Sequence, residues 1–184
     1  MKAPQLSTAE INQAVDDLFN FAFDREDVKW LMANLVTESE AIRAGIEHEL
    51  QLLKIISVGW SISYCLADSP IKKPLAEHYW RAVYTFSQTL SQTAGLMIGQ
   101  DIDYFQTVRK RLDMYVMALN EKTTVKEPAM VIGPEFAKMC KKDDEIFIIM
   151  AGSKMFVSTI ARVKTFLEPL LLNNGEEPAT QRLQ

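Results

Sequence analysis

Apolar residues recur every three or four positions along most of the chain, which is the spacing of one face of an α-helix. The clearest stripe follows residues 102–119, where the charged side chains fall off the apolar line. Alternation at every second position, which would indicate strands, has no run of any length. The spacing predicts helices that begin near Thr8 and near Asp24, two long helices over about 39–68 and 74–95, one over 102–119 and one over about 144–172.

Local signals place the ends of these helices. Ser7 and Glu10 have the spacing of a capping box, in which each side chain binds a backbone N–H of the first turn. Two prolines and a glycine interrupt the periodicity over about 123–134, so this segment is expected to be a loop with a short extended piece at 129–132. One or two helical turns are expected at 135–140, and residues 173–184 are expected to form a disordered tail.

These elements predict an all-α bundle of about six helices in a single domain over residues 1–172. The two long helices, about 39–68 and 74–95, should form an antiparallel hairpin. The helix over about 144–172 has apolar residues on two adjoining stripes, and an arc of that width predicts burial against several neighbours.

Composition then limits the class of protein. The 184 residues are 48% hydrophobic with a formal charge of −4, which excludes collagen-like and low-complexity chains. Cys65 and Cys140 stand alone, so neither a disulfide framework nor a zinc motif is expected, and a reduced, cytoplasmic setting is predicted. The N-terminus lacks the pattern of a signal peptide. Lys154 and Arg162 interrupt the longest apolar stretch, so no membrane span is expected.

Metal and catalytic motifs are missing from the sequence. Carboxylates and histidines that share a metal on one helix lie three or four residues apart. Neither His48 nor His78 has an acidic residue at such a position, and Asp24 and Asp27 are the one acidic pair at these spacings. Nucleophile and phosphate-binding motifs are also missing. We therefore expect no metal, no cofactor and no catalytic residue, although a site assembled from different helices stays open.

One aromatic group near the hairpin end forms a candidate ligand pocket. If the hairpin turns near residue 71, Trp60, Tyr64, His78 and Arg81 gather at one end of the bundle. Aromatic walls with an imidazole and a guanidinium suit a small molecule or a peptide. The alternative is that the aromatic residues belong to the core or its boundary and that His78 is a surface residue.

A basic triplet, Arg109, Lys110 and Arg111, forms a candidate surface for a partner. Nucleic acid is an unlikely ligand, because the protein is acidic overall and the triplet spreads around its helix. Residues 1–60 carry five basic and ten acidic groups. An acidic protein, such as the N-terminal helices of a second copy, fits the triplet at least as well.

The sequence therefore predicts a non-catalytic cytoplasmic helical protein that acts through protein–protein interaction and associates with itself. The alternative is a small-molecule-binding or sensor domain that uses the Trp60 and His78 end of the hairpin. Enzyme activity is the third alternative, and it would require that His48 or His78 meet a buried carboxylate from another helix.

Overall fold

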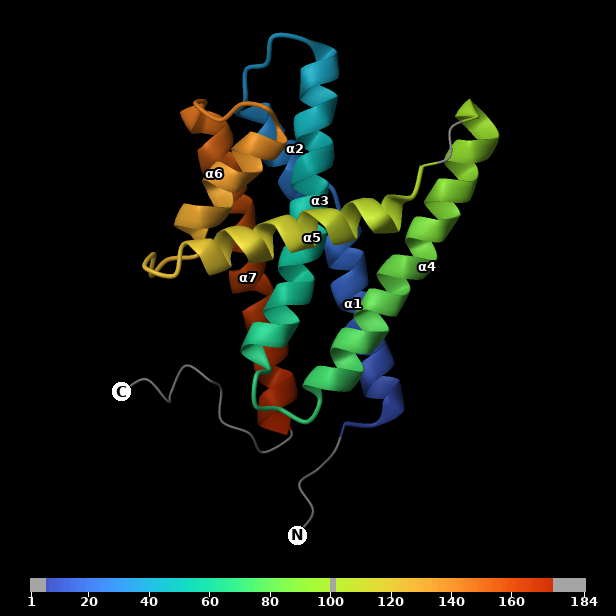
Figure 1. Ribbon diagram of the computed structural model, residues 1–184. Helices are drawn as coiled ribbons and strands as arrows, with labels where there is room; N and C mark the ends of the chain where they lie inside the picture. The colour runs from blue at the N-terminus through green and yellow to red at the C-terminus, as the bar shows by residue number, and fades with distance from the viewer. Residues whose placement is uncertain (1–5, 100–101, 174–184) are drawn as a thin grey trace. The chain divides into compact units, whose positions relative to one another are not determined.

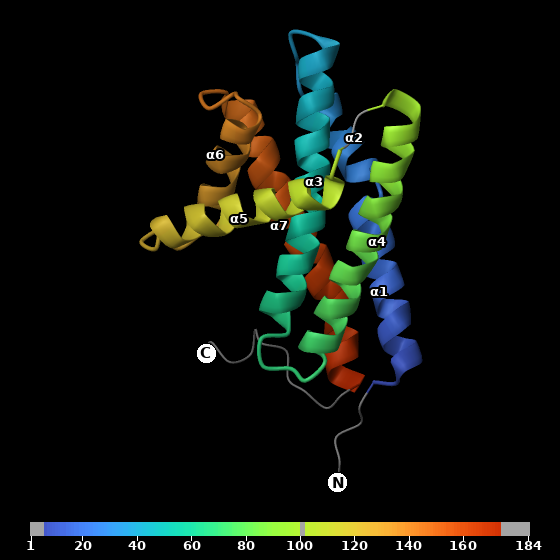
Figure 2. The same ribbon diagram turned by 45° about the vertical axis from the view of Figure 1, so that its right-hand side comes forward.

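The computed structural model describes residues 6–99 and 102–173, which form α-helices and no strand (Figures 1 and 2). The predicted all-α bundle is confirmed. The helices of these residues are α1 (Thr8–Phe23), α2 (Glu26–Ala33), α3 (Glu40–Cys65), α4 (Lys72–Ile98), α5 (Tyr104–Glu121), α6 (Ala129–Met139) and α7 (Ile146–Asn173).

The chain divides into two compact units. Of the described residues, unit 1 holds 6–21, 58–99, 102–105 and 160–173, and unit 2 holds 22–57 and 106–159. The single domain expected over residues 1–172 stays a prediction. The tail expected over 173–184 lies outside the described residues, except that Asn173 is the last residue of α7.

The predicted capping box begins α1. The backbone N–H of Ser7 donates to Glu10 Oε2 at 2.8 Å, and the N–H of Glu10 donates to Ser7 Oγ at 3.2 Å. These bonds satisfy N–H groups that have no partner within the helix. The hydrogen bonds from Ser7 also lower the pKa of Glu10. The helix start at Thr8 is therefore explained by local sequence alone.

The predicted hairpin is formed by α3 and α4, and its turn lies in unit 1. The last turns of α3 pack closely against the first half of α4, because Gly59 lies against the ring of Trp80 and a Cβ at this position would overlap that ring. The buried Tyr79 meets Trp80 edge to face, with ring centroids 5.4 Å apart. α4 runs past the predicted end at residue 95, and Gly99 terminates it in the left-handed conformation with φ 65°.

The segment expected to be a loop over about 123–134, with an extended piece at 129–132, is helical from Ala129 onward, which corrects that prediction. α6 begins at Ala129, directly after Pro128. Proline is favoured beside the first turn of a helix, where its missing N–H removes no helical bond. Pro134 lies inside α6 and removes one such bond. Packing of α6 against α7 offsets that loss, because both Gly133 and Gly152 permit close approach between these helices.

α7 is confirmed as a long helix, but its expected burial applies to one side only. In unit 2 its buried side consists of Ile148, Ala151, Gly152, Met155, Phe156 and Thr159. The opposite side leaves large apolar side chains in solvent because no described residue covers them: Ile146, Phe147, Met150 and Val157 are 68%, 72%, 60% and 53% exposed.

Candidate functional site

A groove in unit 1 lies between α1 and α4, which run side by side in Figures 1 and 2. The groove has a volume of about 700 Å³ and opens to solvent. Volumes of this size are typical of ligand sites in proteins. Its lining residues are Asn12, Val15, Asp16, Phe19, His78, Arg81, Ala82, Thr85, Phe86 and Thr89.

Charged groups line both sides of this α1–α4 groove. Asp16 comes from α1, and Arg81 comes from α4 with His78 one turn before it. Among the described residues, no hydrogen bond or ion pair involves the side chain of Asp16, Arg81 or His78. The groove therefore presents one free carboxylate and one free guanidinium on facing helices.

The apolar part of the groove is aromatic. Phe19 from α1 and Phe86 from α4 meet edge to face, with ring centroids 5.6 Å apart and an interplanar angle of 82°. Phe86 remains 36% exposed, so an apolar ligand can contact it. Thr89 Oγ1 donates to the carbonyl oxygen of Thr85 at 3.3 Å. The groove thus combines an aromatic surface with the charges of Asp16 on α1 and Arg81 on α4.

The structure brings together two of the four residues predicted for the ligand pocket. His78 and Arg81 line the groove, whereas Trp60 and Tyr64 do not. Tyr64 is 67% exposed. The reason is that α4 meets α3 through the side that carries Trp80, while His78 and Arg81 face α1. His78 and Arg81 therefore line a groove against α1, a helix that the sequence did not place there, and a ligand pocket at the hairpin end stays a prediction.

A second surface lies in unit 2, on the exposed side of α7. Ile146, Met150 and Val157 share one helix face at spacings of four and seven residues, and Phe147 lies beside them. Lys154 continues the same face, and its ammonium lies 4.0 Å from the ring centroid of Trp30 on α2. Trp30 is itself 54% exposed. We call these five apolar residues, Ile146, Phe147, Met150, Val157 and Trp30, the α7 face.

The basic triplet is divided between the solvent and the interior of unit 2. Arg109 and Lys110 are exposed. Arg111 binds Glu49 of α3 through two hydrogen bonds, of 2.8 Å from Nε and 2.6 Å from an Nη atom. The bonds to Glu49 raise the pKa of Arg111. Two-point binding of this kind fixes the guanidinium, so Arg111 serves an internal contact and only Arg109 and Lys110 of the triplet are exposed to solvent.

Next to this ion pair lie the buried Tyr115 and the partly buried Cys140. Tyr115 is 2% exposed, and its hydroxyl has no hydrogen-bond partner among the described residues. Burial raises the pKa of Tyr115 well above its usual range. Burial, with a contribution from Glu49, raises the pKa of Cys140 to about 12. Cys140 is therefore a thiol at neutral pH and is a poor nucleophile.

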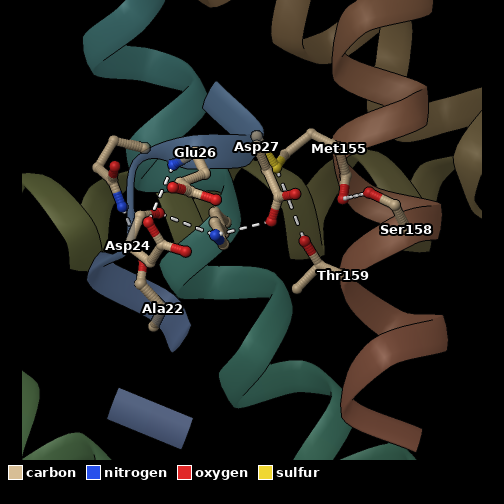
Figure 3. A network of polar contacts seen from close by, with 9 residues as sticks. Ala22, Asp24, Glu26, Asp27, Met155, Ser158 and Thr159 are labelled. Carbon is tan, nitrogen blue, oxygen red and sulfur yellow. Dashed lines mark hydrogen bonds and ion pairs between the residues drawn. The ribbon is translucent and has the colours of Figure 1, made fainter. Parts of the chain in front are cut away.

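A buried lysine joins α3 to the turn before α2 in unit 2. Lys54 is fully buried, and its ammonium donates to the carbonyl oxygen of Asp24 at 2.8 Å and lies 2.9 Å from Asp27 Oδ2 (Figure 3). Gln51 donates to the carbonyl oxygen of Ala22 at 2.7 Å. A buried charge needs such partners, and these contacts hold the turn after α1 against α3.

Two further properties concern metals and membranes. Within residues 6–99 and 102–173, no three histidine, cysteine or acidic side chains form a group that could hold a metal ion. His48 is exposed, and neither it nor His78 hydrogen-bonds a carboxylate in this part of the chain. By length and composition, α7 is the one described helix that could cross a membrane, and 39% of its most apolar window is buried.

Comparison with protein-family models, curated proteins and solved structures finds no match for this chain.

Proposed function

We propose that this chain is a non-catalytic, cytoplasmic protein that acts by binding protein and that its partner at the α7 face is a second copy of itself. The observation that carries this proposal is the exposure of the α7 face, whose five apolar side chains are between 53% and 72% exposed. Soluble monomers seldom leave such a group in water, because each side chain gains free energy when it is covered.

The size and composition of the α7 face support an interface. At about 100 Å² of exposed area for each large side chain, the face offers roughly 500 Å² in each copy, which is the range of functional apolar patches. Two such faces would bury about 1,000 Å², near the lower limit for a stable interface. Trp, Phe and Met are the residue types enriched in the centres of interfaces.

The order of charges along α7 favours a second copy over an unrelated partner. Asp143, Asp144 and Glu145 directly precede α7, and Arg162 and Lys164 follow Val157 along the helix. If two α7 helices pair antiparallel so that Met150 of one meets Val157 of the other, the acidic end of each copy lies beside the basic end of its partner. Such pairing is isologous and closes as a dimer.

Sedimentation equilibrium at micromolar concentration tests this proposal. We expect a mass above the 20.9 kDa of one chain. Met150→Glu should reduce the mass to that of a monomer, because a carboxylate would replace an apolar side chain at the centre of each face. Val36→Glu is the matched control, since Val36 is 97% exposed in the same unit and lies outside the face.

A monomeric wild-type protein would refute self-association at this concentration. If the wild type associates and Met150→Glu associates equally well, a different surface is responsible and the assignment to α7 is wrong. Circular dichroism on both variants should give helix content equal to that of the wild type, because the substituted side chains are already in solvent.

A further inference from the structure

We propose that the α1–α4 groove of unit 1 binds a small zwitterion with an apolar side chain, a class that includes the aromatic and branched-chain amino acids. This inference goes beyond self-association, because the groove residues belong to unit 1 and the α7 face belongs to unit 2. It would give the protein a ligand as well as a protein partner.

The charges of the groove specify a zwitterion. Arg81 offers a fork of N–H donors that matches a carboxylate, and Asp16 on the facing helix offers an acceptor for an ammonium group. These two side chains are not paired with each other or with any other described residue. With neutral His78, the formal charge of the lining is zero, so a ligand that carries both charges is matched better than a simple anion.

The aromatic surface specifies the rest of the ligand. Phe19 and Phe86 are joined edge to face, and the 36% of Phe86 that is exposed can pack against an apolar side chain. Val15 and Ala82 line the groove beside them. A volume of about 700 Å³ admits a free amino acid with room to spare. The ligand should therefore prefer a large apolar side chain, and glycine should bind much more weakly than phenylalanine.

Polar groups without charge can orient the ligand. Asn12 from α1 and His78 from α4 line the groove, and each carries both a donor and an acceptor when the imidazole is neutral. Thr85 also lines the groove, and its hydroxyl can donate to or accept from a ligand. These groups distinguish an amino acid, with several hydrogen-bonding atoms, from a hydrocarbon.

Imidazole NMR of the two histidines provides a direct assay on the full chain. We expect L-phenylalanine to shift the ring resonances of His78 with a dissociation constant on the order of 1 mM, because a small ligand in an open site gains limited free energy. His48 is an internal control, since it is exposed on α3 and belongs to unit 2. Its resonances should stay unchanged over the titration.

Four probes separate the parts of the ligand. L-Phenylalanine carries the carboxylate, the ammonium and the ring, phenylalaninamide lacks the carboxylate, 3-phenylpropionate lacks the ammonium, and glycine lacks the ring. Each of the last three should bind at least about fivefold more weakly than phenylalanine, because each leaves one complementary group of the groove without a partner.

Two variants assign the charges to residues. Arg81→Met should weaken phenylalanine binding at least about fivefold and should remove the preference over phenylalaninamide, while Asp16→Asn should remove the preference over 3-phenylpropionate. Arg109→Met is the matched control, because Arg109 is an exposed arginine in unit 2. All three side chains are exposed, so circular dichroism should remain that of the wild type.

Three results would overturn the proposal. The first is no shift of His78 at roughly 20 mM phenylalanine, about twenty times the expected dissociation constant. The second is equal binding of phenylalanine and 3-phenylpropionate, which would mean that the ammonium is not recognised. The third is binding that neither Arg81→Met nor Asp16→Asn weakens. Repeating the titration on Met150→Glu should give the same His78 shifts. Failure of ligand binding in the groove is therefore distinguishable from failure of self-association through the α7 face.

Discussion

A methyl side chain at Gly133 in α6 should destabilise the protein, and one at Gly45 in α3 should not. Both glycines are inside helices of unit 2, so Gly→Ala gives each the same gain in helix propensity, about 1 kcal/mol at most. They differ in their surroundings. A Cβ at Gly45 meets nothing within 4 Å, whereas a Cβ at Gly133 overlaps Ser153 Oγ and lies 2.7 Å from the carbonyl oxygen of Ile149.

The magnitude follows from those contacts. The carbonyl of Ile149 belongs to the backbone of α7, so it moves only if α6 and α7 separate, and overpacking of this kind costs about 1–3 kcal/mol. Ser153 Oγ donates to the carbonyl oxygen of Ala129 at 3.0 Å, and losing that bond costs about 1 kcal/mol more. After the propensity gain, Gly133→Ala should destabilise the protein by about 1–3 kcal/mol.

Thermal and urea unfolding monitored by circular dichroism measure this difference. For a chain of this length, about 1 kcal/mol moves the melting temperature by roughly 2–4 °C. Gly133→Ala should therefore melt several degrees below the wild type, and Gly45→Ala at or slightly above it. If Gly133→Ala melts at or above the wild type, α6 and α7 are not in close contact at this glycine and the packing argument fails.

Three further predictions concern the buried polar groups of unit 2. Glu49→Gln should lower the free energy of unfolding by about 2 kcal/mol, because it leaves the Arg111 guanidinium without its charged partner. Urea denaturation of Glu49→Gln, Arg111→Met and the double variant should show that the double variant loses less stability than the two single variants added together. At pH 8, Cys140 should react with iodoacetamide far more slowly in the folded protein than in urea, because its pKa of about 12 leaves almost no thiolate, and peptide mass spectrometry reads this directly. Lys54→Met should destabilise the protein by about 1–3 kcal/mol, since the carbonyl of Asp24 and the carboxylate of Asp27 lose their donor, and a melting temperature equal to that of the wild type would contradict this.

The positions of most helices follow from short-range information. The capping box of Ser7 and Glu10 acts within one turn, so α1 begins where the sequence places it. The apolar stripe of α5 likewise needs only its own spacing, and Val108 and Tyr115 on that stripe are buried as expected. Such features are local, and tertiary packing does not alter them.

The sequence does not predict the helix in 123–134 because proline and glycine occur both in loops and at particular positions of helices. In the sequence, Pro128, Gly133 and Pro134 are residue types typical of a loop. In the structure, Pro128 precedes the first turn of α6, and Gly133 is required where this helix meets α7. Only the contact of Gly133 with α7 distinguishes the two roles, and no feature of the sequence predicts that α7 packs against this segment.

Both candidate surfaces depend on which helices become neighbours. The spacing of α7 shows how wide its apolar arc is, but it does not show that Met150 and Val157 lack a covering helix. The spacing of α4 places His78 and Arg81 within one turn, but it does not show that they face α1. A helical pattern specifies the direction of a side chain relative to its own axis, and the choice of neighbours is a separate matter of packing.

The role of Arg111 could have been predicted from the sequence. It lies three residues after Val108 and four before Tyr115, so it shares the helix face of two buried side chains and must point toward the interior. Arg109 and Lys110 lie off that face and are exposed. An inward guanidinium requires a carboxylate, and Glu49 lies on α3 between the buried Ile46 and Leu53, at spacings of three and four residues. Charged residues at the spacing of a core stripe therefore predict an internal ion pair, whereas a count of adjacent basic residues does not.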